Sequence, residues 1–392
     1  MGKIPSIPGM RTRAMAIMAT RSQDQHLVAS VADDLGLAED DSPVTCLVEP
    51  GRRCFVIPSF GWHPWFSHQL YDDTAPNPTY SPANEGKQEE AKMAHYTAVL
   101  APAPKDADFV AALPVPTPLS SVVESMRELA AARPHALIGE TGLDKAFRLP
   151  FQWGPDDDAA SRAAGGDDDE TSLTPGGREG RRLSPYRVRI QHQQAIMTAQ
   201  LRLAGDLGRP VSVHGVQVHG VLHDTISSCW KGHEKEVVSR RQKRMVAPKA
   251  EDLPDFSDDD GDGPADPDSL KDNKKQTTVG GKPFPPRICL HSFSGSVEVL
   301  KQWLRPAIPA DIFFSFSSAV NLGTDGGRAK LGDIVKAVPD RKILVESDLH
   351  VAGDEMEAAL EDMYRFVCRV KGWTLEDGVV RIRENFRRFI VG

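Results

Sequence analysis

Residues 136–144 read ALIGETGLD, an apolar run that reaches Glu140 and continues through a glycine and a leucine to Asp144. A continuously apolar run of this length is typical of a strand covered on both faces, as in a parallel sheet packed between helices. The carboxylate that follows is unusual, because a buried charge is costly unless it is paired or binds an ion. We expect the strand to end at Glu140 and to present this side chain at its carboxyl end.

Short apolar runs of this kind recur along the chain, and each is followed by an amphipathic stretch. The expected strands are 13–20, 53–61, 135–140, 209–215, 287–295, 310–318 and 342–348. The expected helices include 186–208 and 22–36, the latter with Ser22 and Gln25 at capping-box spacing. Repeated strand–helix units favour a doubly wound sheet or a (β/α)₈ barrel. The sequence shows seven units, one fewer than a barrel requires.

Three stretches interrupt this pattern. Residues 67–116 are rich in proline but contain aromatic residues and a possible short helix at 86–100, so we expect them to be partly ordered. Residues 151–184 and 232–286 are rich in glycine and charged residues, and we expect them to be mainly disordered. What remains is close to the ~250 residues of a typical barrel. The sequence therefore predicts a single barrel domain over 10–392 with three insertions.

Charge and cysteine content favour an intracellular protein. The formal net charge is −8, but 156–170 and 249–275 each carry −6, so the rest of the chain sums to +4 and a nucleic-acid partner is not excluded. The five cysteines contain no CxxC pair, which suits reduced thiols. No apolar stretch approaches the ~18 residues of a membrane span. We expect a cytoplasmic or nuclear protein with no membrane association.

Four potential metal ligands lie at the carboxyl ends of four separate predicted strands. They are Glu140, His214, His291 and Asp348. In a parallel barrel these ends meet on one face, where catalytic groups gather. Imidazole and carboxylate together suit Zn or Mn, and carboxylate-rich sites suit Mg. A single residue of this kind is more often merely hydrogen-bonded, but four at equivalent positions predict a metal site.

Further polar residues are expected on the same face. GWHP (61–64) follows a strand end, so His63 is a candidate for contacting a substrate phosphate; the alternative is an ordinary loop histidine. SFSG (292–295) supplies Ser292 and Ser294 at the start of a helix, where an anion can be held; the alternative is an ordinary helix cap.

Several of these motifs, taken in order, resemble those of the TatD family of metal-dependent hydrolases. They are GWHP (61–64), GETGLD (139–144), LGRPVSVH (207–214), LHSFSGS (290–296) and VESD (345–348). The resemblance implies a (β/α)₈ barrel of the amidohydrolase type and a deoxyribonuclease that depends on Mg or another divalent metal. It also implies that Glu140, His214, His291 and Asp348 bind metal, with Glu140 bridging two ions and Asp348 orienting the attacking water.

One departure from the family pattern concerns the first strand. TatD proteins begin with Asp-x-His-x-His, whose histidines bind one of two metal ions, whereas this sequence contains no His-x-His. The missing motif and the missing eighth strand are the same absence; if that absence is real, it leaves at best one well-formed metal site. Either the chain given begins late, or the truncation is real.

Three functions follow as hypotheses. The first is a metal-dependent hydrolase of DNA or another phosphodiester, with Glu140 and Asp348 as its catalytic residues. The second is a different metal hydrolase acting on small molecules, because a fold does not fix a substrate. The third is an inactive protein that binds a partner in the cell-cycle machinery, since the sequence most resembles a fungal TatD branch named for interaction with a subunit of the anaphase-promoting complex.

Overall fold

The structure is a computed structural model that describes residues 4–37, 42–48, 54–82, 87–151, 181–237, 281–322 and 325–392. Its first half comprises η1 (Ile4–Gly9), β1 (Ala14–Met18), α1 (Ser22–Leu35), α2 (Pro43–Val48), β2 (Phe55–Phe60), η2 (Pro64–Gln69), β3 (Leu70–Tyr71), α3 (Gln88–Val99), β4 (Leu100–Ala101), α4 (Ala107–Ala112), β5 (Thr117–Pro118), α5 (Leu119–Ala131) and β6 (Leu137–Asp144). Its second half comprises β7 (Arg187–Val188), α7 (Ile190–Leu207), β8 (Val211–Val216), α8 (His219–Trp230), β9 (Arg287–Leu290), α10 (Val297–Trp303), β10 (Asp311–Ser317), α11 (Ser318–Asn321), α12 (Asp325–Ala337), η6 (Asp340–Lys342), β11 (Ile343–Glu346), α13 (Asp354–Lys371) and α14 (Leu375–Val391).

Seven strands form one sheet in the order β1-β2-β6-β8-β9-β10-β11, and every neighbouring pair is parallel. The order in space is the order in the chain, which is the arrangement of a (β/α) barrel rather than of a doubly wound sheet. The predicted fold class and its seven units are thereby confirmed. Within the described residues, β1 and β11 each pair on one side only, so the sheet is a curled, open barrel.

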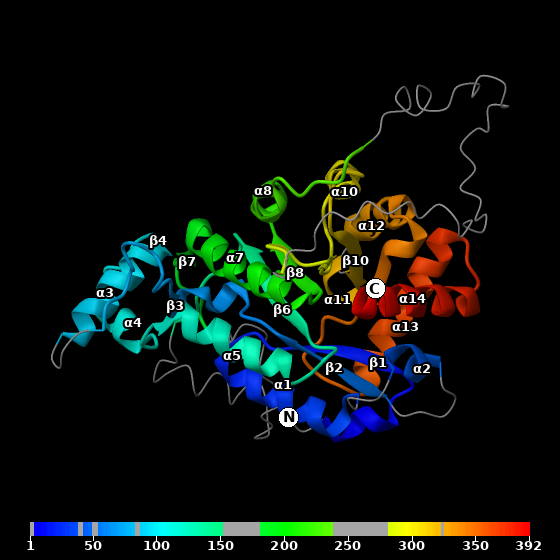
Figure 1. Cartoon of the computed structure of the whole chain (residues 1–392), viewed down its shortest axis with the longest axis horizontal. Helices are drawn as coiled ribbons and strands as arrows, with labels where there is room; N and C mark the ends of the chain where they lie inside the picture. Colours follow the sequence, from blue (N-terminus) through cyan, green and yellow to red (C-terminus); the bar gives the residue numbers. More distant parts are fainter. Residues whose placement is uncertain are drawn as a thin grey trace.

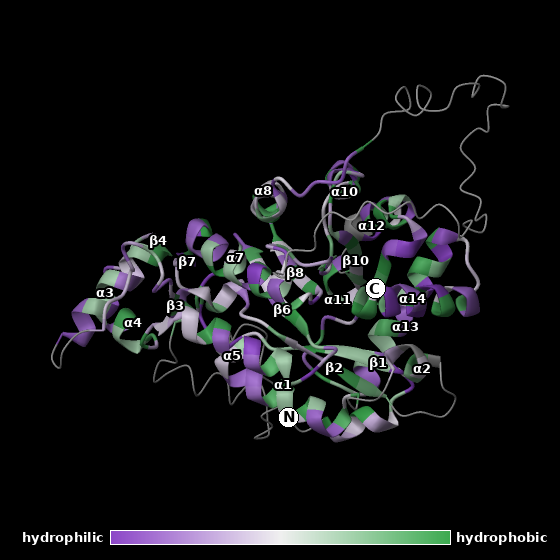
Figure 2. Ribbon diagram, viewed as in Figure 1, coloured by the Kyte–Doolittle hydropathy of each residue, from purple (hydrophilic) through white to green (hydrophobic). Residues whose placement is uncertain are grey.

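Neighbouring residues of a strand contribute to two different cores. On β10, Phe314 belongs to the larger core under the surrounding helices, whereas Phe313 belongs to a smaller core with Phe389 of α14 and Cys46 of α2. Both faces of the sheet are therefore covered, which explains the continuously apolar strands. In Figure 2 the strands are mainly hydrophobic, while purple and green alternate along helices such as α14.

The predicted first insertion forms a lobe at one end of the molecule. α3 and α4 lie at the opposite end of the view from α2 and α14 (Figure 1). Their apolar residues join side chains from other stretches of the chain in a separate core that includes Tyr96, Phe109, Phe147 and Tyr186. The helix predicted at 86–100 is confirmed by α3.

Four local predictions are wrong. The strand expected over 287–295 ends at Leu290. The strand expected to end at Glu140 continues to Asp144. The helix expected from Tyr186 begins at Ile190, because Arg187–Val188 pairs with β4. The expected capping box at Ser22 is not formed; the N-cap residue is Arg21, and the Gln25 amide instead donates to the Gly61 carbonyl at 2.6 Å.

Most of the two insertions predicted to be disordered, residues 152–180 and 238–280, lies outside the described residues. Two of the described ends of these stretches contribute buried residues, whereas residues 232–237 are exposed. Ser184 is 0% exposed and Phe284 is 2% exposed. The domain boundaries stay a prediction.

The stretch before β1 is fastened to α13. The Thr12 amide donates to Glu357 Oε1 at 2.8 Å, and Arg11 Nε donates to Glu357 Oε2 at 3.3 Å.

Among the described helices, none combines the length and apolarity that crossing a bilayer requires.

Candidate functional site

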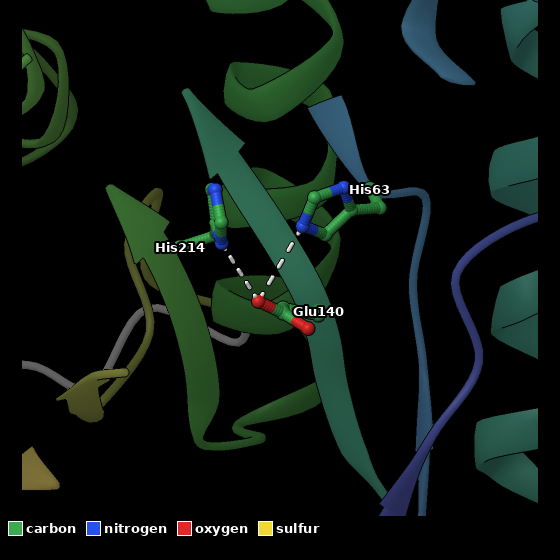
Figure 3. Close-up of side chains that lie close together, drawn as sticks. All are labelled: His63, Glu140 and His214. Atoms are coloured by element: carbon green, nitrogen blue, oxygen red, sulfur yellow. Dashed lines mark hydrogen bonds and ion pairs between the residues drawn. The ribbon is translucent and has the colours of Figure 1, made fainter. Parts of the chain in front are cut away.

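A β-bulge on β6 positions Glu140. Ile138 pairs with Val211 of β8, but Thr141 pairs with Val213, so β6 contains one extra residue between these two pairs. Gly139 within the bulge has φ +141°, a region that L side chains rarely adopt. Bulges of this kind re-aim a side chain near functional sites. Here the Glu140 carboxylate points towards His63 and His214 (Figure 3).

Three histidines converge on one oxygen of Glu140. Oε1 lies 3.0 Å from His214 Nδ1, 3.5 Å from His63 Nε2 and 3.7 Å from His291 Nε2. His63 follows β2, His214 lies on β8, and His291 follows β9. The carboxyl ends of four parallel strands thus build one cluster, as predicted from the sequence.

Two of these histidines also contact a further carboxylate. His214 Nε2 lies 3.2 Å from Asp144 Oδ2, and His291 Nδ1 lies 2.9 Å from Glu346 Oε2. The Nε2 of His291 additionally lies 3.0 Å from Asp348 Oδ1. A histidine that binds a metal usually holds a carboxylate or carbonyl on its other nitrogen, which orients the ring. His214 and His291 both have this arrangement, with Glu140 on one nitrogen and Asp144 or Glu346 on the other.

His63 has different partners and therefore a different chemistry. The Trp65 backbone amide donates to His63 Nδ1 at 3.2 Å, so this nitrogen is an acceptor. Burial lowers the pKa of His63, and the nearby His214 lowers it further, so the ring is neutral. A neutral imidazole that accepts at Nδ1 carries its proton at Nε2. His63 thus presents an N–H donor, which suits a phosphate oxygen better than it suits a metal ion.

The charges of the cluster are strongly coupled. Burial alone would raise the pKa of Glu140, but the charge of His291 and the hydrogen bonds from His214 and His63 hold it well below its usual range. Burial opposes the charged form of His214 too, yet its bonds to Asp144 and Glu140 raise its pKa to about 9. His291 behaves in the same way beside Glu346. The cluster is a negative site that attracts positive charge.

The two serines predicted to bind substrate, Ser292 and Ser294, lie in different surroundings. The Ser292 hydroxyl donates to Glu346 Oε1 at 2.6 Å, and its amide donates to the same oxygen at 2.7 Å, so Ser292 holds Glu346 in place. Ser294 is exposed and makes no hydrogen bond with the cluster among the described residues.

Ser292 and Asp348 both have positive φ values, of 40° and 55°. Such backbone strain concentrates at functional sites.

The sequence did not single out the residues that support the cluster. Asp144 and Glu346 orient the histidines, and the Trp65 indole N–H donates to Asp144 Oδ2 at 2.6 Å. The Gln193 side chain accepts from the Asp144 amide at 2.7 Å and donates to the Asp144 carbonyl at 2.9 Å. Asp144 and Glu346 belong to the motifs GETGLD and VESD. Each motif contains two carboxylates, and the sequence analysis identified only one of them as a site residue.

The donor set fits a divalent cation. Ligand atoms of His63, Glu140 and His214 all lie within 4.8 Å of one another, and His291 and Asp348 adjoin them. Mixed imidazole and carboxylate ligands suit Zn, Mn and similar ions. Glu140, His214, His291 and Asp348 stay the predicted ligands of such an ion, with His63 beside them as a donor.

The fold and this cluster together define the class: a hydrolase family built on a (β/α) barrel with histidines and carboxylates at the carboxyl ends of its strands. A family model described as TatD related DNase matches residues 16–391. The chain belongs to the TatD family.

Relatives of known sequence span nearly all of the chain. The Cut9-interacting protein scn1 of Schizosaccharomyces pombe is 34% identical over 376 residues, which cover 96% of this chain and 91% of that protein. A protein of Saccharomyces cerevisiae named as an uncharacterized deoxyribonuclease is 26% identical over 347 residues, covering 86% and 82%. A solved TatD homologue of Escherichia coli superposes with a TM-score of 0.44 at 12% identity, covering 96% of this chain and 86% of that one.

Proposed function

We propose that this chain is a divalent-metal-dependent hydrolase of phosphodiester bonds and that its substrate is DNA. The observation that carries the proposal is the convergence of His63, His214 and His291 on Glu140 Oε1, at 3.0 to 3.7 Å. The name of the budding yeast relative, a deoxyribonuclease, supports the choice of DNA. Magnesium is the ion we predict.

The residues divide the work of hydrolysis. A divalent ion bound by Glu140, His214, His291 and Asp348 would supply Lewis acidity and ease the ionisation of water. Asp348 is 31% exposed, the most accessible of the four carboxylates in the cluster, which supports assigning to it the orientation of the attacking water. The Nε2 proton of His63 is placed to bond a non-bridging phosphate oxygen, where negative charge grows in the transition state.

The test uses the full chain, stripped of metal with a chelator and reloaded with Mg, Mn or Zn in turn. Cleavage of single-stranded and duplex oligonucleotides is measured alongside that of small phosphodiesters, esters and lactones. We expect metal-dependent DNA cleavage that falls at least a hundredfold in Glu140→Gln and in Asp348→Asn. Asp354→Asn, at an exposed acid on α13, is the matched control. Full activity in both site variants, or hydrolysis of esters or lactones alone, would overturn the proposal.

A second candidate function is protein binding. The fission yeast relative is named for interaction with Cut9, and it is similar to this chain over nearly its whole length. We propose that this chain binds the corresponding cell-cycle protein, in the cytoplasm or nucleus. Co-purification with the Cut9 counterpart from native extract, retained in Glu140→Gln, would support binding that is independent of catalysis. Failure of the two purified proteins to bind each other would exclude this second function.

A further inference from the structure

A cleft adjoins the candidate metal centre and shares one side chain with it. Its volume is about 160 Å³, below the roughly 300–1,000 Å³ of a pocket for a drug-sized ligand. Its walls are mainly aromatic and aliphatic, with arginine at the edge. Its lining includes Arg21, Trp65, Phe66, Ala112, Phe147 and Arg181. The cleft has room for one planar ring rather than for a large molecule.

Trp65 is the shared side chain. Its indole N–H bonds to Asp144, which in turn holds His214. Its ring lies 4.5 Å from the ring of His63 and stacks on Phe147 with 4.8 Å between centroids and 14° between planes. A ring bound against Trp65 in the cleft would therefore lie next to a group bound in the cluster.

The cleft also carries positive charge. The Arg21 guanidinium lies 4.8 Å from the centre of the Phe66 ring, and 30% of the Arg21 side chain is exposed. Arg181 lies on the lining as a second guanidinium. Aromatic faces with arginine beside them suit a ligand that combines a planar base with an anionic backbone.

We propose that this cleft binds one base of a single-stranded DNA substrate, adjacent to the phosphate that enters the metal centre. The base stacks against the aromatic wall at Trp65, and Arg21 and Arg181 contact the neighbouring phosphates. The proposal rests on the proposed function. It adds a subsite built by Ala112 at the end of α4 and by Arg181, both from stretches that interrupt the repeated strand–helix pattern.

The first test fills the cleft without altering the metal centre. Ala112→Trp places an indole in the cleft, and Ala111→Trp places the same bulk on the exposed side of α4 as the matched control. Stacking of a base on an aromatic side chain contributes about 1–3 kcal/mol, which corresponds to roughly fivefold to 150-fold in affinity. We therefore expect kcat/KM for single-stranded DNA to fall about tenfold or more in Ala112→Trp and to stay unchanged in Ala111→Trp.

A set of oligonucleotides with one abasic residue at successive positions sharpens this test. Wild type should lose about tenfold in kcat/KM at one position near the cleaved bond. Ala112→Trp should lose nothing further at that position, because the base contact is already absent. If wild type shows the same kcat/KM for the intact substrate and for every abasic substrate, the base-binding assignment is overturned.

The second test measures binding without catalysis and does not depend on filling the cleft. Fluorescence anisotropy of a labelled oligothymidylate is followed in chelator, with Arg181→Ala compared with Arg187→Ala, an exposed arginine that does not line the cleft. Arg181→Ala should weaken binding several-fold and reduce its salt dependence, and Arg187→Ala should not. Equal binding by the two variants would overturn the phosphate contact.

The two proposals fail in different ways. If wild type cleaves no phosphodiester but Ala112→Trp still weakens oligonucleotide binding, the subsite stands and the proposed catalysis falls. If wild type cleaves DNA and Ala112→Trp changes neither binding nor kcat/KM, the subsite falls and the catalysis stands. Loss of a protein partner in Ala112→Trp, with DNA kinetics unchanged, would assign the cleft to a peptide instead.

Discussion

The buried carboxylate of Glu140 is tolerated because its charge is balanced by neighbours. Its side chain is only 12% exposed, and burial on its own would favour the protonated acid. Three imidazoles within 3.7 Å of one oxygen reverse that preference. The apolar strand thus leads to a glutamate whose charge the three histidines balance. This explains why an apolar run and a carboxylate adjoin in the sequence.

Glu346 is expected to act through His291 rather than on a substrate. Glu346→Gln leaves a group of the same size but removes the charge beside His291 Nδ1, so we expect metal affinity to fall about 10- to 100-fold. Isothermal titration of the metal-free protein with Mn²⁺ measures this directly. Glu355→Gln, at an exposed position on α13, is the control. Equal affinity in both variants would show that the Glu346 charge does not orient a ligand.

The site could be predicted in outline but not in its pairings. Glu140, His214, His291 and Asp348 were identifiable because each follows an apolar run. Asp144 and Glu346 were missed because a sequence does not show which of two nearby carboxylates faces an imidazole nitrogen. That distinction depends on the β6 bulge and on the backbone turn at Ser292, neither of which leaves a periodic signal.

At the scale of single elements, β6 is the least regular strand and the most important for the site. The bulge needs glycine, because a Cβ on Gly139 would meet the backbone oxygen of Ser212 at 2.7 Å. Glycine is also needed at Gly61, directly after β2, because a Cβ there would meet the backbone of Gly139 at 2.3 Å. Two close backbone approaches therefore fix the direction of Glu140.

Gly139→Ala should destabilise the fold, whereas Gly220→Ala should not. Backbone strain at φ +141° alone costs on the order of 1–3 kcal/mol, and the contact with Ser212 adds to it. Gly220 lies on α8 with open space at its Cβ position, and alanine in a helix is favoured over glycine by up to about 1 kcal/mol. Urea denaturation of both variants gives the comparison. A Gly139→Ala protein as stable as wild type would contradict this account of the bulge.

Element boundaries were predicted less well than element types. All seven strands were identified, since apolar runs covered on both faces are conspicuous. The end of β6 was misplaced by four residues because the run seemed to stop at a charge, yet Thr141 to Asp144 still pair with β8. The start of α7 was misplaced because a two-residue pairing with β4 precedes it.

At the scale of the whole molecule, buried histidines hold the segment that follows His63. His95 of α3 donates from Nε2 to the His68 carbonyl at 2.9 Å, and His192 of α7 donates to the Ser67 carbonyl at 2.9 Å. His68 itself bonds to the Trp65 carbonyl at 3.1 Å. Distant parts of the chain thus position η2, which carries Trp65 between the metal centre and the cleft.

These histidines predict a pH dependence of stability. Burial lowers the pKa of His68 to about 3 and that of His95 to about 4, and it lowers that of His192 as well. Between those values and 6.5 the unfolded chain binds protons that the folded chain does not. Stability therefore falls as the pH falls below 6.5, by about 1.4 kcal/mol per pH unit for each such histidine.

Urea unfolding between pH 7.5 and 4.5 checks this slope. His95→Gln should make it shallower by about 1.4 kcal/mol per pH unit, whatever its effect on stability at neutral pH. His26→Gln, at an exposed position on α1, is the matched control. Parallel slopes for wild type and His95→Gln would show that His95 does not stay neutral in the folded protein.

The bond between Thr12 and Glu357 has a consequence for the newborn chain. The two partners are 345 residues apart, and translation adds roughly 5–20 residues per second. The stretch before β1 therefore waits on the order of 20–70 seconds for its partner to leave the ribosome. Through that interval β1 can pair with β2 while the stretch before it is not yet held to α13, and the unpaired edge of β1 can recruit strands from neighbouring chains. We therefore expect a chaperone that covers this edge at the ribosome to raise the soluble yield of the protein.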